Sequence, residues 1–328
     1  MIEFLNEALM GKPVWVWLLF IGVVIALLVI DLGLIHRKSK VIGASESLLM
    51  SAFYITIALL FGVWIWFSIG PQSAIEYMTG FMVEKTLALD NVFIISLIFT
   101  SLAVPAAFQH RVLFWGILGV IVLRAMMIGV GATLVAEFYW ILYVFAVFLI
   151  VTGIKMYVVG EKRQDIESHP ALRLMRKTMR ITPKLHAEKF FVRQPHPVTG
   201  KAVLWATPLF VALVMVEIVD LIFAIDSVPA IFAITTDPFV VYTSNIFAIL
   251  GLRALYFALA TIIERFAYLK QALAMVLVFI GSKIFVADLA GWEKFPVGLS
   301  LGVTAGLIGA GVIYSLYKTR EARPAARV

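Results

Sequence analysis

Long apolar stretches separated by short polar segments dominate the pattern of this chain. A helix needs about 20 apolar residues to cross a bilayer, and about nine stretches approach or exceed that length. They cover residues 13–35, 46–69, 74–101, 110–131, 136–158, 204–232, 239–263, 269–289 and 296–317. The pattern therefore predicts an all-α polytopic membrane protein with about nine transmembrane helices.

Composition supports the same fold class. Of the 328 residues, 62% are hydrophobic and 14% are charged, whereas a soluble domain is nearer half apolar and a quarter charged. The net charge of +7 could suggest a nucleic-acid partner. We expect none, because the basic residues concentrate between apolar stretches, which is typical of membrane topology. The chain has no cysteine, which excludes disulfides, thiolate metal sites and thiol redox chemistry.

The distribution of lysine and arginine predicts the orientation of the chain. Twenty of these residues fall on one side of the predicted spans, ten of them in the loop 159–203. The other side has only Lys12 and Lys294. The positive-inside rule places the N-terminus outside and the C-terminus in the cytoplasm, as an odd number of spans requires. Glu3 and Glu7 replace the basic start of a signal peptide, so we expect no cleaved leader.

Three short motifs occur twice along the chain, in the same order. They are Asp90-Asn91-Val92 with Asp226-Ser227-Val228, Leu-Arg-Ala at Arg124 and Arg253, and Gly-x-Lys at Lys155 and Lys283. Each copy covers three predicted spans, the third to fifth and the sixth to eighth. Because three is odd, the copies must lie in opposite orientations across the membrane. Inverted repeats of this kind are typical of transporters, with the substrate site at midplane between the copies.

The spans and repeats divide the chain into five parts. These are 1–72 with the first two helices, 73–158 with the first repeat, 159–203 as a basic cytoplasmic loop, 204–290 with the second repeat, and 291–328 with the last helix and a basic cytoplasmic tail. The loop contains the amphipathic stretch ALRLMRKTMR. Two interpretations stay open: this stretch lies on anionic lipid headgroups, or the loop is a solvated determinant of topology.

Acidic and amide side chains inside the predicted spans are the candidate chemistry. A carboxylate near the bilayer centre costs roughly 2.5–3.5 kcal/mol, so each must meet a proton, a base or a cation. We expect a metal-binding set formed by Glu84, Asp90, Asn91, Glu217, Asp220 and Asp226, with Asp31 and Ser227 as further candidates. Oxygen ligands without thiolate or embedded imidazole suit magnesium, calcium or manganese rather than copper or zinc.

The spacing of three acids on the sixth span suggests how the set assembles. Glu217 and Asp220 lie one turn apart and share a helix face, whereas Asp226 would point the opposite way. Pro229 lacks a backbone donor and clashes with the carbonyl of Ile225. We therefore expect a helix break that turns Asp226 towards its partners and frees backbone carbonyls as further ligands.

Five bases also lie within the predicted spans, so an alternative is that the acids only pair with them to hold helices together. We expect Lys85, Arg124 and Arg253 to balance carboxylates, and Lys155 and Lys283 to snorkel towards the membrane surfaces. Ion pairs are costly in a bilayer, where small residues pack helices more cheaply. For the acids we therefore favour a binding or permeation site.

The motifs also resemble those of a known family. The matching stretches are EKTLALDNVF at 84–93, E-x2-D-x5-DSVPAIFA-x-T-x-DPF at 217–239, NIFAILGLRALYF at 245–257 and GSKIF at 281–285, and EKFFVR at 188–193 is similar to the Alx-type members. Together they resemble the TerC family of integral membrane proteins. The resemblance implies an inner-membrane protein of the LysE-type transporter superfamily whose best supported activity is manganese(II) efflux. It also implies that the six acidic and amide positions of the expected metal set are the family's motif positions.

We thus expect a secondary transporter that exports a hard divalent ion, manganese(II) by resemblance, in exchange for protons. No nucleotide-binding motif is present, and we expect neither an enzyme nor a bound cofactor. The alternative is a non-transporting membrane component, such as a stress-response, redox-associated or tellurium-resistance scaffold. A weaker one is export of an organic solute. The expected partners are membrane lipid, the metal ion and protons, and the sequence leaves protein partners, stoichiometry and oligomeric state open.

Overall fold

The computed structural model describes residues 6–33, 44–159, 169–195, 200–259, 269–292 and 295–321. Within these residues the chain is mostly helical. The helices are α2 (Val14–Gly33), α3 (Ala44–Ser68), α4 (Pro71–Ser101), α5 (Ala106–Glu137), α6 (Ile141–Val159), α7 (Pro170–Thr178), α8 (Pro208–Phe232), α9 (Pro238–Leu250), α10 (Leu252–Leu259), α11 (Leu269–Leu289) and α12 (Val297–Glu321). The strands are β1 (Ala8–Leu9), β2 (Lys12–Pro13), β3 (Phe191–Pro195) and β4 (Ala202–Ala206).

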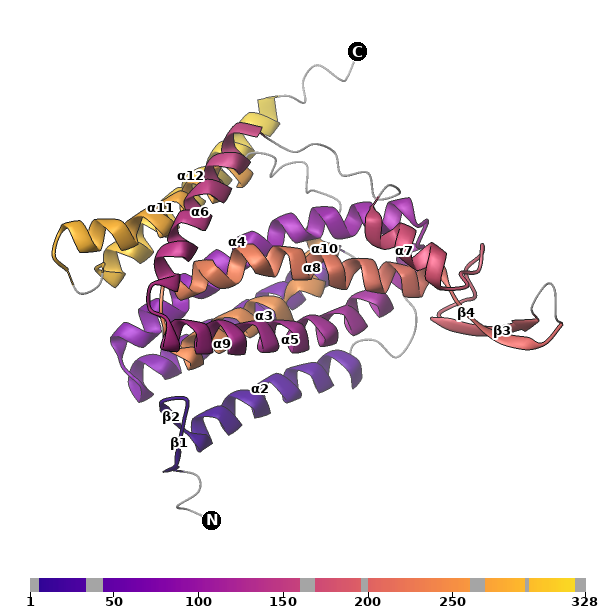
Figure 1. The fold of residues 1–328 in the computed structure, drawn as a ribbon, viewed down its shortest axis with the longest axis horizontal. Helices are drawn as coiled ribbons and strands as arrows, with labels where there is room; N and C mark the ends of the chain where they lie inside the picture. The colour runs from indigo at the N-terminus through magenta and orange to yellow at the C-terminus, as the bar shows by residue number, and fades with distance from the viewer. Residues whose placement is uncertain are drawn as a thin grey trace.

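The long helices form one bundle, with the hairpin of β3 and β4 extending from one end (Figure 1). The central helices are α4, α5, α8 and α9, in which α4 packs on α9 and α5 packs on α8. Helix α2 packs on α9 at one edge, and α6, α11 and α12 form a group at the other. The four central helices therefore surround the middle of the bundle, where the buried polar residues lie.

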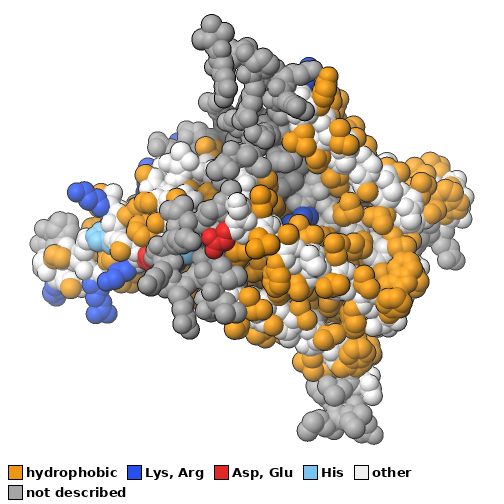
Figure 2. All heavy atoms as spheres, turned by 180° about the vertical axis from the view of Figure 1, so that it is seen from behind, with side chains coloured by type: hydrophobic (Ala, Val, Ile, Leu, Met, Phe, Trp, Pro, Cys, Tyr) orange, Lys and Arg blue, Asp and Glu red, His pale blue; other side chains and the backbone are white. Residues whose placement is uncertain are grey.

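Seven helices of the described part are long and apolar enough to cross a membrane, judged by length and composition. The apolar part of α2, Val14–Ile30, is slightly shorter than these, and α4 carries four charged residues along its length. Large apolar side chains cover the bundle, while lysine and arginine gather around the hairpin end (Figure 2). An apolar surface of this extent indicates an integral membrane protein, because soluble proteins rarely expose contiguous apolar patches of such size.

Helix α8 does not break where its proline predicted. It runs continuously from Pro208 to Phe232 with Pro229 inside, so the expected interruption before Pro229 is wrong. The proline removes a single backbone donor, and it lies in the last turn of the helix, where few further hydrogen bonds depend on it. The start of the helix also differs from the predicted span, because residues up to Ala206 belong to β4.

The predicted loop 159–203 contains ordered structure in its described part. Helix α7 is capped by the side chain of His169, and its Leu172 and Met175 are buried in an apolar cluster with residues of α4, α5 and α8. Strands β3 and β4 pair antiparallel, with Phe191 opposite Ala206. Leu172 and Met175 thus face protein and are not available to insert among lipid headgroups, whereas Leu174 of the same stretch is 61% exposed.

Helices α6 and α11 approach closely at two glycines. A Cβ atom on Gly153 would lie 2.7 Å from the carbonyl oxygen of Ala274, and one on Gly281 would lie 2.6 Å from the carbonyl oxygen of Ala146. Each glycine therefore faces the alanine that lies two turns before the other glycine. This reciprocal pattern requires the two helices to run antiparallel. Small residues are the usual means of bringing helices together in a membrane.

We expect Gly281→Ala to destabilise the protein, because the added methyl group would meet a backbone oxygen of α6. Overpacking of this kind costs roughly 1–3 kcal/mol. Thermal unfolding in detergent should show a lower Tm. Gly302→Ala is the matched control, since a Cβ atom there meets nothing within 4 Å. Equal Tm values for the two variants would contradict the close approach of α6 and α11.

Candidate functional site

Arg124 of α5 is the centre of the polar cluster inside the bundle. It is 1% exposed, and its guanidinium binds Asp220 of α8 through two parallel contacts. Nε donates to Oδ2 at 3.0 Å and Nη2 donates to Oδ1 at 3.2 Å. Such bidentate pairs between arginine and carboxylate are among the strongest polar contacts in proteins, because charge and geometry both match.

The remaining guanidinium nitrogen, Nη1, links Arg124 to three more helical positions. It forms an ion pair with Glu84 of α4, and it donates to Ser227 Oγ at 3.1 Å and to Asn245 Oδ1 at 3.3 Å. One buried arginine therefore joins side chains from α4, α5, α8 and α9. Removing two acids and a base from water is costly, and the contacts around the guanidinium offset that cost.

Asn91 of α4 extends the cluster along its helix. Its Nδ2 donates to Asp220 Oδ1 at 3.2 Å, and its side chain is buried. Asn91 lies two turns after Glu84, which puts both side chains on the same face of α4. The carboxylate of Asp220 thus accepts hydrogen bonds from α4 and α5 at once.

Three buried oxygens around the cluster have no hydrogen-bond partner among the described residues. They are Glu84 Oε2, Asn91 Oδ1 and Glu217 Oε2. Buried polar atoms are nearly always satisfied by protein or by ordered water. Lone pairs left open in this way are suited to accept a cation, a water molecule or a proton.

Glu217 lies one turn before Asp220 on α8, as the spacing predicted. Its carboxylate packs against Gly119 of α5, where a methyl group would overlap the carboxylate oxygens. A glycine at this position therefore makes room for the acid between two helices. No ion pair of Glu217 occurs within the described part of the chain.

Two small voids adjoin the cluster. One of about 10 Å³ is lined by Asn91, Asp220 and Arg253 together with apolar residues of α4, α5 and α8. The other, of about 40 Å³, is lined by Asn91, Arg124 and Ser227 together with residues of α6 and α11. A void of that larger size can hold a water molecule. Asn91, which carries one of the three open oxygens, lines both voids and so lies next to space that water or a small ion could enter.

The structure thus brings together five residues that the sequence singled out: Glu84, Asn91, Asp220, Ser227 and Arg124. Three other predicted residues, Asp31, Asp90 and Asp226, have side chains outside the described part of the structure.

The predicted bases differ in what they contact. Lys85 Nζ donates to the carbonyl oxygen of Ala248 at 3.1 Å, and Arg253 is buried beside the smaller void. Lys155 is exposed. Lys283 is only 6% exposed and donates to Ser300 Oγ at 3.1 Å, so the expectation that it snorkels is wrong. The hydroxyl on α12 gives its ammonium group a partner inside the protein.

Asn245 is the member of the cluster that the sequence analysis missed. It is fully buried, and its amide oxygen accepts from Arg124. The available signal was an amide within an otherwise apolar span, where an unpaired polar side chain would be costly.

The described residues contain no group of three or more His, Asp or Glu side chains arranged to hold a metal ion. In this conformation the guanidinium of Arg124 fills the position between Glu84 and Asp220. A positive charge is therefore already present where two carboxylates from different helices converge.

These features define a helical integral membrane protein with a buried cluster of acids, amides and one arginine. The chain belongs to the TerC family, because the model of the integral membrane protein TerC family matches residues 69–323.

Relatives of similar length support this assignment. An uncharacterized membrane protein of Rickettsia bellii is 48% identical over 302 residues, which is 92% of this chain and 97% of the relative. Another, from Myxococcus xanthus, is 47% identical over 95% of each chain. A protein of Escherichia coli K12 named "Putative membrane-bound redox modulator Alx" is 43% identical over 91% of this chain and 92% of its own. No solved structure matches.

We expect Arg124→Gln to be strongly destabilising, because it leaves Glu84 and Asp220 buried without their counter-charge. Breaking a buried ion pair costs about 3–5 kcal/mol. Thermal unfolding in detergent should therefore show a large drop in Tm.

Arg111→Gln serves as the control for the Arg124 variant. Arg111 also pairs with an acid, Glu188 at 3.0 Å, but both side chains are about one third exposed. Its loss should cost about 0–1 kcal/mol. Similar Tm values for the two variants would show that the buried cluster contributes little to stability.

Proposed function

We propose that the protein is a secondary-active transporter that exports a hard divalent cation, manganese(II) in the first place, in exchange for protons. The observation that carries the proposal is the set of buried oxygens, on Glu84, Asn91 and Glu217, that lack a partner among the described residues. A purely structural ion-pair cluster would be expected to satisfy its own acceptors. Open acceptors, one of them on Asn91, which lines both small voids, instead favour a site that receives a cation.

The donor chemistry favours a hard ion. Carboxylate, amide and hydroxyl oxygens surround the cluster, and the chain contains no cysteine. Such ligands suit manganese, magnesium or calcium. Asp90 and Asp226, which lie next to Asn91 and Ser227 in the sequence, would add two further carboxylates to the same site.

In the proposed mechanism, Arg124 controls how the site fills and empties. Its guanidinium forms ion pairs with Glu84 and Asp220. An entering divalent ion would compete with the guanidinium for the same carboxylates, so binding requires Arg124 to withdraw from at least one of them. Protons would compete for these oxygens as well, and this competition provides a physical basis for the exchange of metal against protons.

Alternating access would come from two units of three spans in opposite orientation, α4 to α6 and α8 to α11, in which α9 and α10 form one span. The antiparallel contact between α6 and α11 supports this arrangement, because the equivalent glycines of the two units face equivalent alanines. The packing of α4 on α9 has its counterpart in the packing of α5 on α8. Adding α2, α3 and α12 gives nine spans, with the N-terminus outside, the basic hairpin in the cytoplasm and the protein in the inner membrane.

The name of the Escherichia coli relative refers to redox modulation. A redox function of this chain would have to use groups other than thiols, because it has no cysteine. Under the scaffold alternative, ordered water would satisfy the open oxygens in the interior. Transport accounts for them directly, so it is the function that we propose.

Manganese uptake into inside-out vesicles with an acidic lumen tests the proposal, because luminal protons would then drive entry of the metal. Wild type should show uptake that depends on the pH gradient. Glu217→Gln should reduce the initial rate at least tenfold, since it removes a carboxylate that has no ion pair in the described structure. Asp226→Asn should do the same.

Glu188→Gln is the matched control for the transport assay, because Glu188 pairs with Arg111 in the predicted cytoplasmic part and should leave the rate unchanged. Wild-type rates in both site variants would mean that these acids are structural. Absence of manganese, magnesium and calcium uptake by folded wild type would contradict transport and favour the scaffold hypothesis.

A further inference from the structure

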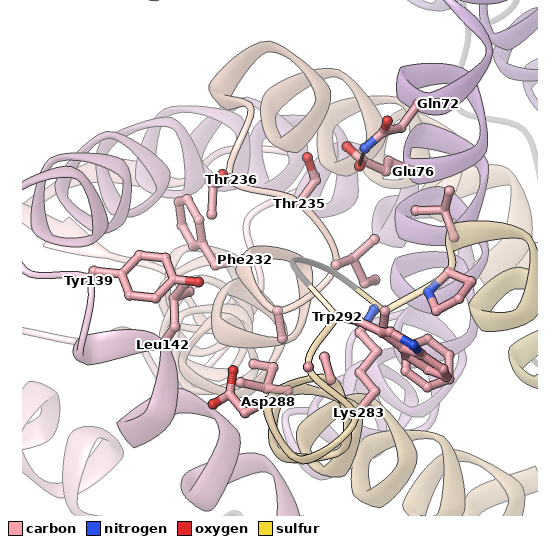
Figure 3. A pocket seen from close by; sticks show the side chains of 18 residues that line it. Gln72, Glu76, Tyr139, Leu142, Phe232, Thr235, Thr236, Lys283, Asp288 and Trp292 are labelled. Carbon is pink, nitrogen blue, oxygen red and sulfur yellow. Dashed lines mark hydrogen bonds between the residues drawn. The ribbon is translucent and has the colours of Figure 1, made fainter.

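A cavity of about 910 Å³ opens at the end of the bundle opposite the hairpin. Its walls come from the start of α4, the start of α6, the ends of α8 and α11, and the start of α12 (Figure 3). The hairpin leads into the first residue of α8, and the cavity lies at the last. A helix of 25 residues is about 37 Å long, so the basic hairpin and the cavity lie near opposite membrane surfaces.

Along α4 and α8, the cavity and the polar cluster are separated by apolar residues. On α4, Glu76 lines the cavity, Val83 is completely buried, and Leu87 lines the void that touches Arg124. On α8, Phe232 lines the cavity and Ser227 lines the same void. Ala230 lies between them and is completely buried.

Helices α6 and α11 show the same order of features. On α6, Leu142 lines the cavity, Leu149 is completely buried, and Thr152 lines the void. On α11, Lys283 lines the cavity and Leu273 lines the void. The α11 residues in between, Val276 and Ile280, belong with Val83, Leu149 and Ala230 to one apolar cluster. Four helices therefore contribute to a single apolar layer between the cavity and the void.

The layer is a barrier to ions in this conformation. Its five members, Val83, Leu149, Ala230, Val276 and Ile280, are each 0% exposed. An ion that entered such a layer would lose its hydration without gaining ligands, which is strongly unfavourable. The cluster around Arg124 adjoins the void on one side of the layer, whereas the large cavity lies on the other side.

The lining of the cavity suits a hydrated cation. Glu76 and Asp288 provide carboxylates, Thr235 and Thr236 provide hydroxyls, and Figure 3 shows these groups around a common space. Glu76 accepts from Gln72 at 3.1 Å. The ammonium of Lys283 is held by Ser300, and a fixed positive charge in the wall disfavours tight retention of a cation. Surroundings that are rich in oxygen atoms but bind the cation weakly favour its release from the binding site.

We propose that this cavity is the extracytoplasmic exit vestibule for the divalent cation and that the apolar layer is its closed gate. The inference rests on the proposed transport function and adds the route by which the ion leaves. Opening would require α4 and α8 to separate from α6 and α11 at the layer. The backbone contacts of Gly153 and Gly281 join α6 to α11, so these two helices would move as one unit against α4 and α8.

Because the chain has no cysteine, single cysteine substitutions can test the vestibule directly. Thr236→Cys probes the cavity, Ala230→Cys probes the layer, and Lys201→Cys probes the exposed hairpin. Each is treated with a membrane-impermeant maleimide, in spheroplasts to reach the outer face and in inside-out vesicles to reach the cytoplasmic face. Labelling after denaturation in detergent confirms that every thiol is reactive.

We expect Thr236→Cys to react only in spheroplasts and Lys201→Cys only in inside-out vesicles. Ala230→Cys should react in neither without metal, and manganese(II) should raise its labelling in spheroplasts at least threefold. Reaction of Thr236→Cys from the cytoplasmic face would overturn the vestibule. Metal-independent labelling of Ala230→Cys as fast as that of Thr236→Cys, or no response to manganese while uptake is intact, would overturn the gate.

The labelling assay is independent of transport, so the two proposals fail in different ways. A wrong pattern of labelling with normal manganese uptake contradicts the vestibule and leaves the transporter standing. The expected metal-free pattern with no manganese uptake by wild type contradicts the transporter, and the cavity then remains an outward-facing space closed by the apolar layer.

Discussion

Burial of a guanidinium between carboxylates of different helices is the constraint on which this structure depends. Arg124 is 1% exposed, and its partners Glu84 and Asp220 are 1% and 6% exposed. Contact with the counter-charge offsets much of the desolvation of each group, and hydrogen bonds with Asn91, Ser227 and Asn245 add to it. The positions of α4, α5 and α8 are therefore tied to one another through a single side chain.

Close helix packing makes this constraint possible. Gly119 leaves room for the carboxylate of Glu217 between α5 and α8, and Gly153 and Gly281 let α6 approach α11 to backbone contact. In a bilayer the hydrophobic effect does not drive helices together, so small residues and buried polar contacts have to do so. The polar cluster and the glycine contacts are thus complementary parts of one packing scheme.

The sequence predicted the helices and most members of the cluster, because apolar length and the cost of buried charge are local properties. The spacing of Glu217 and Asp220 predicted a shared face. The sequence did not predict that Asn245 would join the cluster, that Ser300 would accept a hydrogen bond from Lys283, or that α8 would continue through Pro229. The first two outcomes depend on which helix lies opposite, which a single sequence does not record directly, and the third depends on the place of Pro229 in the last turn of α8.

The same contacts that stabilise the cluster would also couple it to movement. Arg124 bridges Glu84 on α4 and Asp220 on α8, and these helices also contribute Val83 and Ala230 to the apolar layer. A movement of α4 and α8 away from α6 and α11 that also shifts these two helices relative to each other would therefore lengthen the bridge and weaken one of its two ion pairs. A carboxylate released in this way needs another positive charge, and a metal ion or a proton can supply it. Helix movement and the occupancy of the site would then be linked by electrostatics alone.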